Sequence, residues 1–97
     1  MNEIENSKIM IVDDQPSNLS VIFEYLTAFN TDLMLIQKGQ EAIEIAEIKK
    51  PDIILLDIIM PEMNGFDVCR KLKENKNTED IPVIFMSCLT DTDNIVK

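Results

Sequence analysis

The sequence predicts an α/β fold: an open, parallel sheet with helices on both faces, giving three α/β/α layers. Four short apolar runs recur along the 97 residues, and none alternates polar with apolar residues. Continuous runs of this length are typical of strands that are buried on both faces of a parallel sheet. Segments with helical spacing lie between the runs. Strands that alternate with helices form open sheets with right-handed crossovers.

The four predicted strands consist almost wholly of Ile, Leu, Val, Met and Phe. They cover residues 9–12, 33–36, 53–56 and 83–86. Their even spacing along the chain, without repeats or linkers, favours a single domain.

Three helices are expected between the strands, because apolar residues recur three or four positions apart. The stripes are Leu19, Ile22, Leu26 and Phe29; Ala42, Ile43, Ile45 and Ala46; and Phe66, Cys69 and Leu72. Gly39 is expected to serve the turn before the second helix, and Pro51 to end that helix. Asn64 and Gly65 suit a turn that opens the third helix. Residues 75–80 are polar and are expected to form a surface loop.

Composition excludes several classes of function. The formal net charge is −9, which argues against a nucleic-acid surface or docking to an anionic membrane in this segment. The chain has no His, which excludes a Ser-His-Asp triad and a histidine-ligated metal. No apolar stretch approaches the ~20 residues of a membrane span, and residues 1–8 lack the apolar core of a signal peptide. Cys69 and Cys88 have no metal-type spacing, so we expect a reduced, cytoplasmic protein.

Acidic and hydroxyl side chains follow three of the predicted strands. Asp13 and Asp14 come after the first strand, Asp57 after the third and Ser87 after the fourth. In open α/β sheets the ligand crevice lies beyond the carboxyl ends of the strands. Three carboxylates at one place repel each other unless a cation lies between them. Mg²⁺ suits such a set, because it binds one or two carboxylates and leaves positions for water and phosphate oxygens.

Each of these residues also has a plainer interpretation. The Asp pair can cap the helix that opens near Pro16, which is as probable for the pair alone as metal binding. Asp57 alone can be a turn residue, and Ser87 alone can satisfy local backbone groups. The combination of all three positions favours the metal site.

The residues around these positions resemble the receiver domain of two-component response regulators, a flavodoxin-like fold. The matching segments are IVDD (11–14), LLDIIMPEMNGF (55–66) and IPVIFMS (81–87). The resemblance runs from about Lys8 to the last residue, and the segment around Asp57 is its most specific part.

The resemblance implies a role for each site residue. Asp57 is expected to be the nucleophile that carries the phosphoryl group as an acyl phosphate. Asp14 is expected to bind Mg²⁺ directly, Asp13 largely through water, and Ile59 through its backbone carbonyl. Ser87 is expected to donate a hydrogen bond to a phosphoryl oxygen. The implied donor is a sensor histidine kinase or a phosphotransfer protein. The chain is then not an enzyme beyond its own phosphorylation and dephosphorylation.

The chain departs from the family pattern at its C-terminal end. Receivers normally continue into a fifth strand that supplies a Lys to the site, and Lys97 comes too early for that role. We therefore expect residues 1–97 to form a partial receiver domain, incomplete at the C-terminus. The strand at residues 83–86 would then be an apolar sheet edge, which favours a homodimer or a swapped assembly.

Two other classes of function remain as alternatives. One is a phosphatase or phosphotransferase of the haloacid-dehalogenase type, which needs a second Asp where this chain has Ile59. The other is an interaction or dimerisation module that keeps only the receiver fold. Ile59 and Leu89 are apolar and cannot orient a hydrolytic water, which predicts a long-lived acyl phosphate. An unchanged phosphate lifetime in Ile59→Asn would remove that hypothesis.

Overall fold

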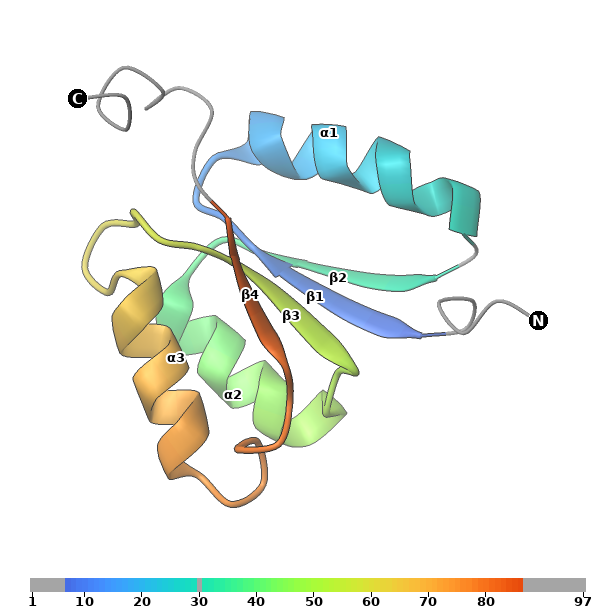
Figure 1. Cartoon of the computed structure of the whole chain (residues 1–97). Coiled ribbons are helices and arrows are strands. Elements are labelled where there is room, and N and C mark those ends of the chain that lie inside the picture. The colour runs from blue at the N-terminus through green and yellow to red at the C-terminus, as the bar shows by residue number, and fades with distance from the viewer. Residues whose placement is uncertain (1–6, 30, 87–97) are drawn as a thin grey trace.

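The computed structural model describes residues 7–29 and 31–86, and it contains one four-stranded parallel sheet (Figure 1). The strands are β1 (Lys8–Val12), β2 (Asp32–Ile36), β3 (Ile53–Asp57) and β4 (Val83–Met86). Their order across the sheet is β2-β1-β3-β4, and every neighbouring pair is parallel. The predicted open parallel sheet is therefore confirmed, with strand bounds that agree to within one residue.

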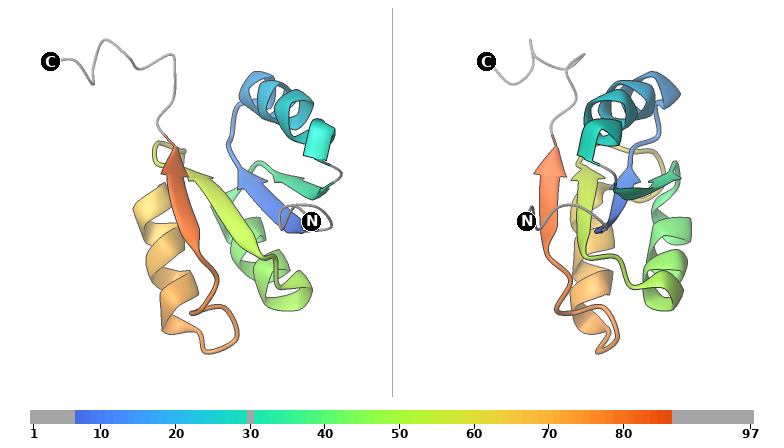
Figure 2. Two further views of the ribbon diagram at one scale, coloured as in Figure 1. Left: turned by 45° about the vertical axis from the view of Figure 1, so that its right-hand side comes forward. Right: turned by 90° about the vertical axis from the view of Figure 1, so that its right-hand side faces the viewer.

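In the described part of the chain, three α-helices cover the two faces of the sheet. They are α1 (Pro16–Leu26), α2 (Gly39–Lys49) and α3 (Gly65–Glu74), and the 3-10 turn η1 (Thr27–Phe29) follows α1. The views in Figure 2 place α1 on one face and α2 with α3 on the other. This gives the three α/β/α layers that the sequence predicts.

The two faces of the sheet hold two separate cores, which explains why the two central strands are apolar apart from Lys8 at the start of β1 and Asp57 at the end of β3. Ile9 and Ile11 of β1 pack with Leu19 of α1. Met10 and Val12 face the other way and pack in the core that contains α2 and α3. Successive side chains of a strand point to opposite faces, so a strand covered on both sides needs no polar position.

The helix ends follow signals in the sequence. Pro16 occupies the first turn of α1, where its missing N–H is not needed. Lys50 ends α2 in a left-handed conformation (φ 50°), directly before Pro51. The side chain of Asn64 caps α3 by accepting a hydrogen bond of 2.9 Å from the amide of Asp67. The start of α3 at Asn64 and Gly65 is therefore as predicted, but it is formed by a helix cap, with Gly65 as the first residue of the helix.

The predicted apolar stripe of α3 is wrong at one position, because Phe66 does not face the core. Val68 and Leu72 are buried in the core, and Cys69 packs against it half-buried. Phe66 is 55% exposed and packs instead on Phe85, with ring centroids 5.0 Å apart. Because Phe66 lies in the first turn of α3, it reaches the edge strand β4 rather than the centre of the sheet.

Gly39 has a different role from the expected turn. It is the first residue of α2, and its φ is not positive. A Cβ at this position would lie 2.7 Å from Cγ2 of Val68. Gly39 is therefore required by the close approach of α2 to α3, and not by a turn.

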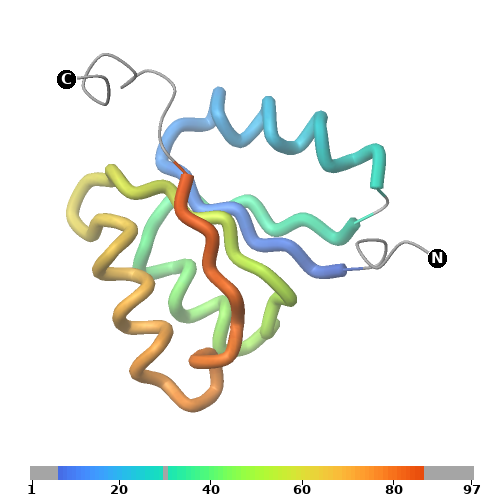
Figure 3. The backbone as a smooth tube through the Cα atoms, in the orientation of Figure 1, coloured from blue at the N-terminus to red at the C-terminus, as the bar shows by residue number. Residues whose placement is uncertain are grey.

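The carboxyl ends of the strands lie at one edge of the sheet, which the backbone trace in Figure 3 makes visible. The β1–α1, β2–α2 and β3–α3 connections all leave from this edge. Within the described parts of the chain, no helix is long and apolar enough to cross a membrane.

Candidate functional site

Three aspartates converge at the carboxyl edge of the sheet. Asp13 and Asp14 directly follow β1, and Asp57 is the last residue of β3 rather than the first residue after it. Val12 pairs with Leu56 in the sheet, so the next residue of each strand brings Asp13 beside Asp57. One carboxylate oxygen from each aspartate lies within 4.8 Å of the others.

Asp57 has an environment that is unusual for a carboxylate. Its side chain is 1% exposed, and its Oδ1 atom is buried without a hydrogen-bond donor among the described residues. Burial, followed by the charge of Asp13, raises the pKa of Asp57 to about 6, although the amides of Ile59 and Ile58 act against this rise. A buried ionised oxygen without a partner is costly, and a cation would offset that cost.

Asp13 is held by two local hydrogen bonds. Its Oδ1 accepts from the amide of Gln15 at 2.9 Å, and its Oδ2 accepts from Nδ2 of Asn18 at 3.1 Å. Asp13 therefore makes local hydrogen bonds at the start of α1, which agrees in part with the helix-capping interpretation. The N-cap residue itself is Gln15, whose side chain makes no capping bond. Both bonds fix the Asp13 carboxylate beside Asp57, so local capping and a metal site are compatible.

The connection between β3 and α3 is fitted closely to the site. The amide of Ile58 donates to the carbonyl of Met86 at 3.3 Å, and the amide of Gly65 donates to the carbonyl of Ile58 at 2.8 Å. A Cβ at position 65 would clash with the carbonyl oxygen of Asp57. Only glycine at position 65 lets α3 begin this close to the buried carboxylate.

Of the other two predicted site residues, the structure describes Ile59 but not Ser87. Ile59 follows Asp57 by two residues and its side chain is 61% exposed. The metal contact of its backbone carbonyl stays a prediction. Ser87, Cys88 and Leu89 lie outside the described residues. Met86, which precedes Ser87, pairs with Asp57 in the sheet register.

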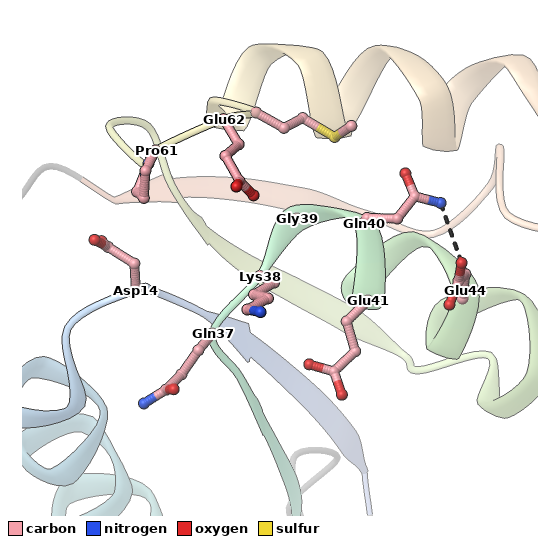
Figure 4. Close-up of a pocket in the computed structure, with 10 residues that line it drawn as sticks. Asp14, Gln37, Lys38, Gly39, Gln40, Glu41, Glu44, Pro61 and Glu62 are labelled. Atoms are coloured by element: carbon pink, nitrogen blue, oxygen red, sulfur yellow. Dashed lines mark hydrogen bonds between the residues drawn. The ribbon is translucent and has the colours of Figure 1, made fainter.

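A cavity beside Asp14 was not predicted from the sequence. It has a volume of about 610 Å³ and lies between the β2–α2 and β3–α3 connections (Figure 4). Lys38 and Glu62 are among the residues that line it. In the sequence Lys38 carried no clear signal. The left-handed backbone of Glu62 (φ 69°) is visible only in the structure.

The donor set of the three aspartates fits a hard divalent cation. Carboxylate oxygens are the ligands that Mg²⁺ prefers, and these three are already gathered, with Asp13 and Asp57 buried and Asp14 partly exposed toward the cavity. The unpartnered Oδ1 of Asp57 is an oxygen that such an ion would satisfy. The site can therefore hold a cation next to a buried carboxylate.

Comparisons with known proteins identify the fold. The family model described as response regulator receiver domain matches residues 9–97. The response regulator PleD of Caulobacter vibrioides is 40% identical over 87% of this chain and 18% of its own length. A probable cyclic di-GMP phosphodiesterase of Vibrio cholerae is 38% identical over 90% of this chain and 20% of its own length. The chain thus spans about a fifth of these curated relatives.

A solved structure agrees with the family match. It is the receiver domain of a sensor histidine kinase of Pseudomonas aeruginosa with a magnesium ion coordinated in its active-site cleft. It superposes with a TM-score of 0.80 at 26% sequence identity, covering 94% of this chain and 77% of that one. With four parallel strands in the order β2-β1-β3-β4 and the acidic cluster at their carboxyl ends, this chain belongs to the response regulator receiver domain family of two-component systems.

Proposed function

We propose that this chain accepts a phosphoryl group on Asp57, in the presence of Mg²⁺ held by Asp13, Asp14 and Asp57. The observation that supports this most is the meeting of the three carboxylates within 4.8 Å around the buried side chain of Asp57. A receiver fold without phosphorylation would have no use for this costly arrangement, so the alternative of a pure interaction module is not favoured.

The donor in this proposal is a phosphohistidine on a sensor histidine kinase or a phosphotransfer protein. A carboxylate oxygen of Asp57 forms a bond to phosphorus, and the bond between phosphorus and the imidazole nitrogen breaks. The electron pair of the broken bond stays on the imidazole nitrogen. The product is an acyl phosphate on Asp57 and a free histidine. An ionised carboxylate needs no general base for this attack.

The electrostatics of the site suit this transfer. An anionic carboxylate and an anionic phosphoryl group repel each other, and phosphoryl transfer depends mainly on positioning and on charge neutralisation. Mg²⁺ supplies that neutralisation when bound. Asp13 and Asp14 hold two further negative charges near Asp57, both of which raise its pKa in the metal-free protein. The same two negative charges attract a cation to the site.

Two further residues complete the proposed site. The backbone carbonyl of Ile59 is proposed as a metal ligand, and the Ser87 hydroxyl as a donor to a phosphoryl oxygen. The chain acts as a phosphorylation-controlled switch and not as an enzyme, beyond forming and hydrolysing its own acyl phosphate. We place this switch in the cytoplasm, where its phosphodonor and reduced cysteines would be found.

The edge of the sheet suggests a second kind of contact. Among the described residues β4 is the last strand on its side, and Ile84 and Phe85 on it are 50% and 38% exposed. The strand carries no charged residue that would discourage pairing. We propose that a second copy of the chain pairs along β4, giving a homodimer.

Acetyl phosphate tests the proposed function without a kinase. The chain is incubated with this small phosphodonor with and without Mg²⁺, and its intact mass is measured. We expect one added phosphoryl group that requires Mg²⁺ and is absent in Asp57→Asn. A folded protein that binds Mg²⁺ but gains no phosphate would refute the phosphoacceptor function.

A further inference from the structure

The cavity beside Asp14 has an uneven charge. Among the described residues that line it, four are acidic and one is basic. The acidic residues are Asp14, Glu41, Glu44 and Glu62, and the basic residue is Lys38. Asp14 belongs both to this cavity and to the aspartate cluster, so the cavity opens directly onto the proposed metal centre.

Glu62 is held in this cavity by its backbone. The amide of Met63 donates to the carbonyl of Pro61 at 2.6 Å, which closes a γ-turn centred on Glu62. The φ of Glu62 is 69°, in the left-handed region that is unfavourable for residues other than glycine. Figure 4 shows its carboxylate directed from this turn into the cavity, toward the first turn of α2.

The water ligands of a cation at the aspartate cluster would need hydrogen-bond acceptors. Mg²⁺ gives up water reluctantly and usually keeps several water ligands when a protein supplies few carboxylates. Those waters need hydrogen-bond acceptors, and such outer partners contribute to metal affinity. Glu62 lies on the opposite wall of the cavity from the connection that carries Lys38, and Asp14 is at one end of the same cavity, whose volume of about 610 Å³ has room for several waters.

We infer that Glu62 is a positioning residue for the metal centre. Its carboxylate accepts hydrogen bonds from waters of a Mg²⁺ ion bound at Asp13, Asp14 and Asp57. The positive charge of Lys38 acts against the binding of this ion. The inference rests on the metal site of the proposed function. The left-handed turn at Glu62 has a role in this arrangement, because it directs the carboxylate into the cavity. The positive charge of Lys38 in the same cavity is expected to lower the affinity for a cation.

The test is the dissociation constant for Mg²⁺, measured by isothermal titration calorimetry at low ionic strength, where surface charges are little screened. Glu62→Gln keeps the shape of the side chain and removes its charge, and it should raise the dissociation constant by about tenfold, the lower end of the effect of outer partners. Glu62→Asp restores the charge at a residue type that tolerates a positive φ, so its affinity should be close to that of the wild type. Lys38→Gln should bind Mg²⁺ more tightly than the wild type.

Glu44→Gln is the matched control. It removes the same charge from the opposite end of the cavity from Asp14, where Glu44 accepts a hydrogen bond of 3.2 Å from Gln40. Its affinity should change much less than that of Glu62→Gln. Equal weakening in both variants, or wild-type affinity in Glu62→Gln, would overturn the role of Glu62. A wild-type chain that binds no Mg²⁺ would overturn this inference together with the proposed metal centre, whereas failure of Glu62→Gln alone leaves that centre intact.

Discussion

At the scale of single residues, the burial of the Asp57 carboxylate lowers the stability of the fold but suits the proposed chemistry. Its carboxylate is buried at the end of β3, next to two further aspartates, with one oxygen left without a donor among the described residues. Buried ionised groups without partners destabilise a fold, and they persist where function requires them. We therefore expect the metal-free protein to be less stable than the same fold with an uncharged residue at position 57.

This conflict predicts a dependence of stability on pH. The folded-state pKa of Asp57 is raised from 3.8 to about 6, so the folded state binds its proton more tightly than the unfolded state does. The free energy of unfolding therefore falls as pH rises from about 4 to about 6, and the loss is complete above that range. At neutral pH the cost of ionising Asp57 is about 3 kcal/mol without metal, because one pKa unit corresponds to ~1.36 kcal/mol.

Urea unfolding of the metal-free chain and of Asp57→Asn at pH 4 and pH 7 measures this cost. Asp57→Asn should be the more stable protein at pH 7 by about 1–3 kcal/mol, and its advantage should shrink at pH 4. An Asp57→Asn protein that is less stable than the wild type at pH 7 would contradict the strain assigned to the ionised carboxylate.

At the scale of elements, the site depends on how closely α3 begins behind β3. Gly65 starts the helix directly against the backbone of Asp57 and Ile58, where no Cβ fits. Gly39 starts α2 against α3, where a Cβ would meet side-chain atoms of Val68 and Met63. Backbone is less able to move aside than a side chain, so the two glycines differ in how strictly they are required.

Alanine substitutions separate these two cases. Gly65→Ala should destabilise the protein by about 1–3 kcal/mol, the usual cost of overpacking, and should weaken Mg²⁺ binding by displacing Asp57. Gly39→Ala is the control, because it adds the same methyl group at the start of a helix and meets side-chain atoms of Val68 and Met63 in place of backbone. Thermal unfolding and Mg²⁺ titration of both variants test this. A Gly65→Ala protein as stable as Gly39→Ala would contradict the close fit of the β3–α3 connection.

At the scale of the whole molecule, the sequence predicts the layers well because burial on both faces leaves a direct pattern. The runs that became β1 to β4 have no polar positions, and the acidic residues at their ends could be placed on one edge from the topology alone. Features that depend on contacts between distant segments were beyond the sequence. The exposure of Phe66, the approach of Gly39 to Val68 and the cavity at Asp14 each need the packing of two or more elements.

The proposed pairing along β4 is also a property of the whole molecule. The exposed residues Ile84, Phe85 and Phe66 gather around this edge and β4 carries no charge, although the net charge of −9 opposes self-association in general. Light scattering at increasing concentration should therefore show a dimer, and Ile84→Lys should return the chain to a monomer. A wild-type chain that stays a monodisperse monomer would defeat this prediction.

The central claim is that Asp57 is the residue that receives the phosphoryl group. The most direct test is to phosphorylate the chain with acetyl phosphate and Mg²⁺, reduce the acyl phosphate with borohydride, and sequence the peptides by mass spectrometry. Reduction converts an aspartyl phosphate to homoserine, which marks the acceptor position. The structure predicts homoserine at position 57, dependent on Mg²⁺. Homoserine at Asp13 or Asp14, or at none of the aspartates in a chain whose mass shows the phosphate, would contradict the claim.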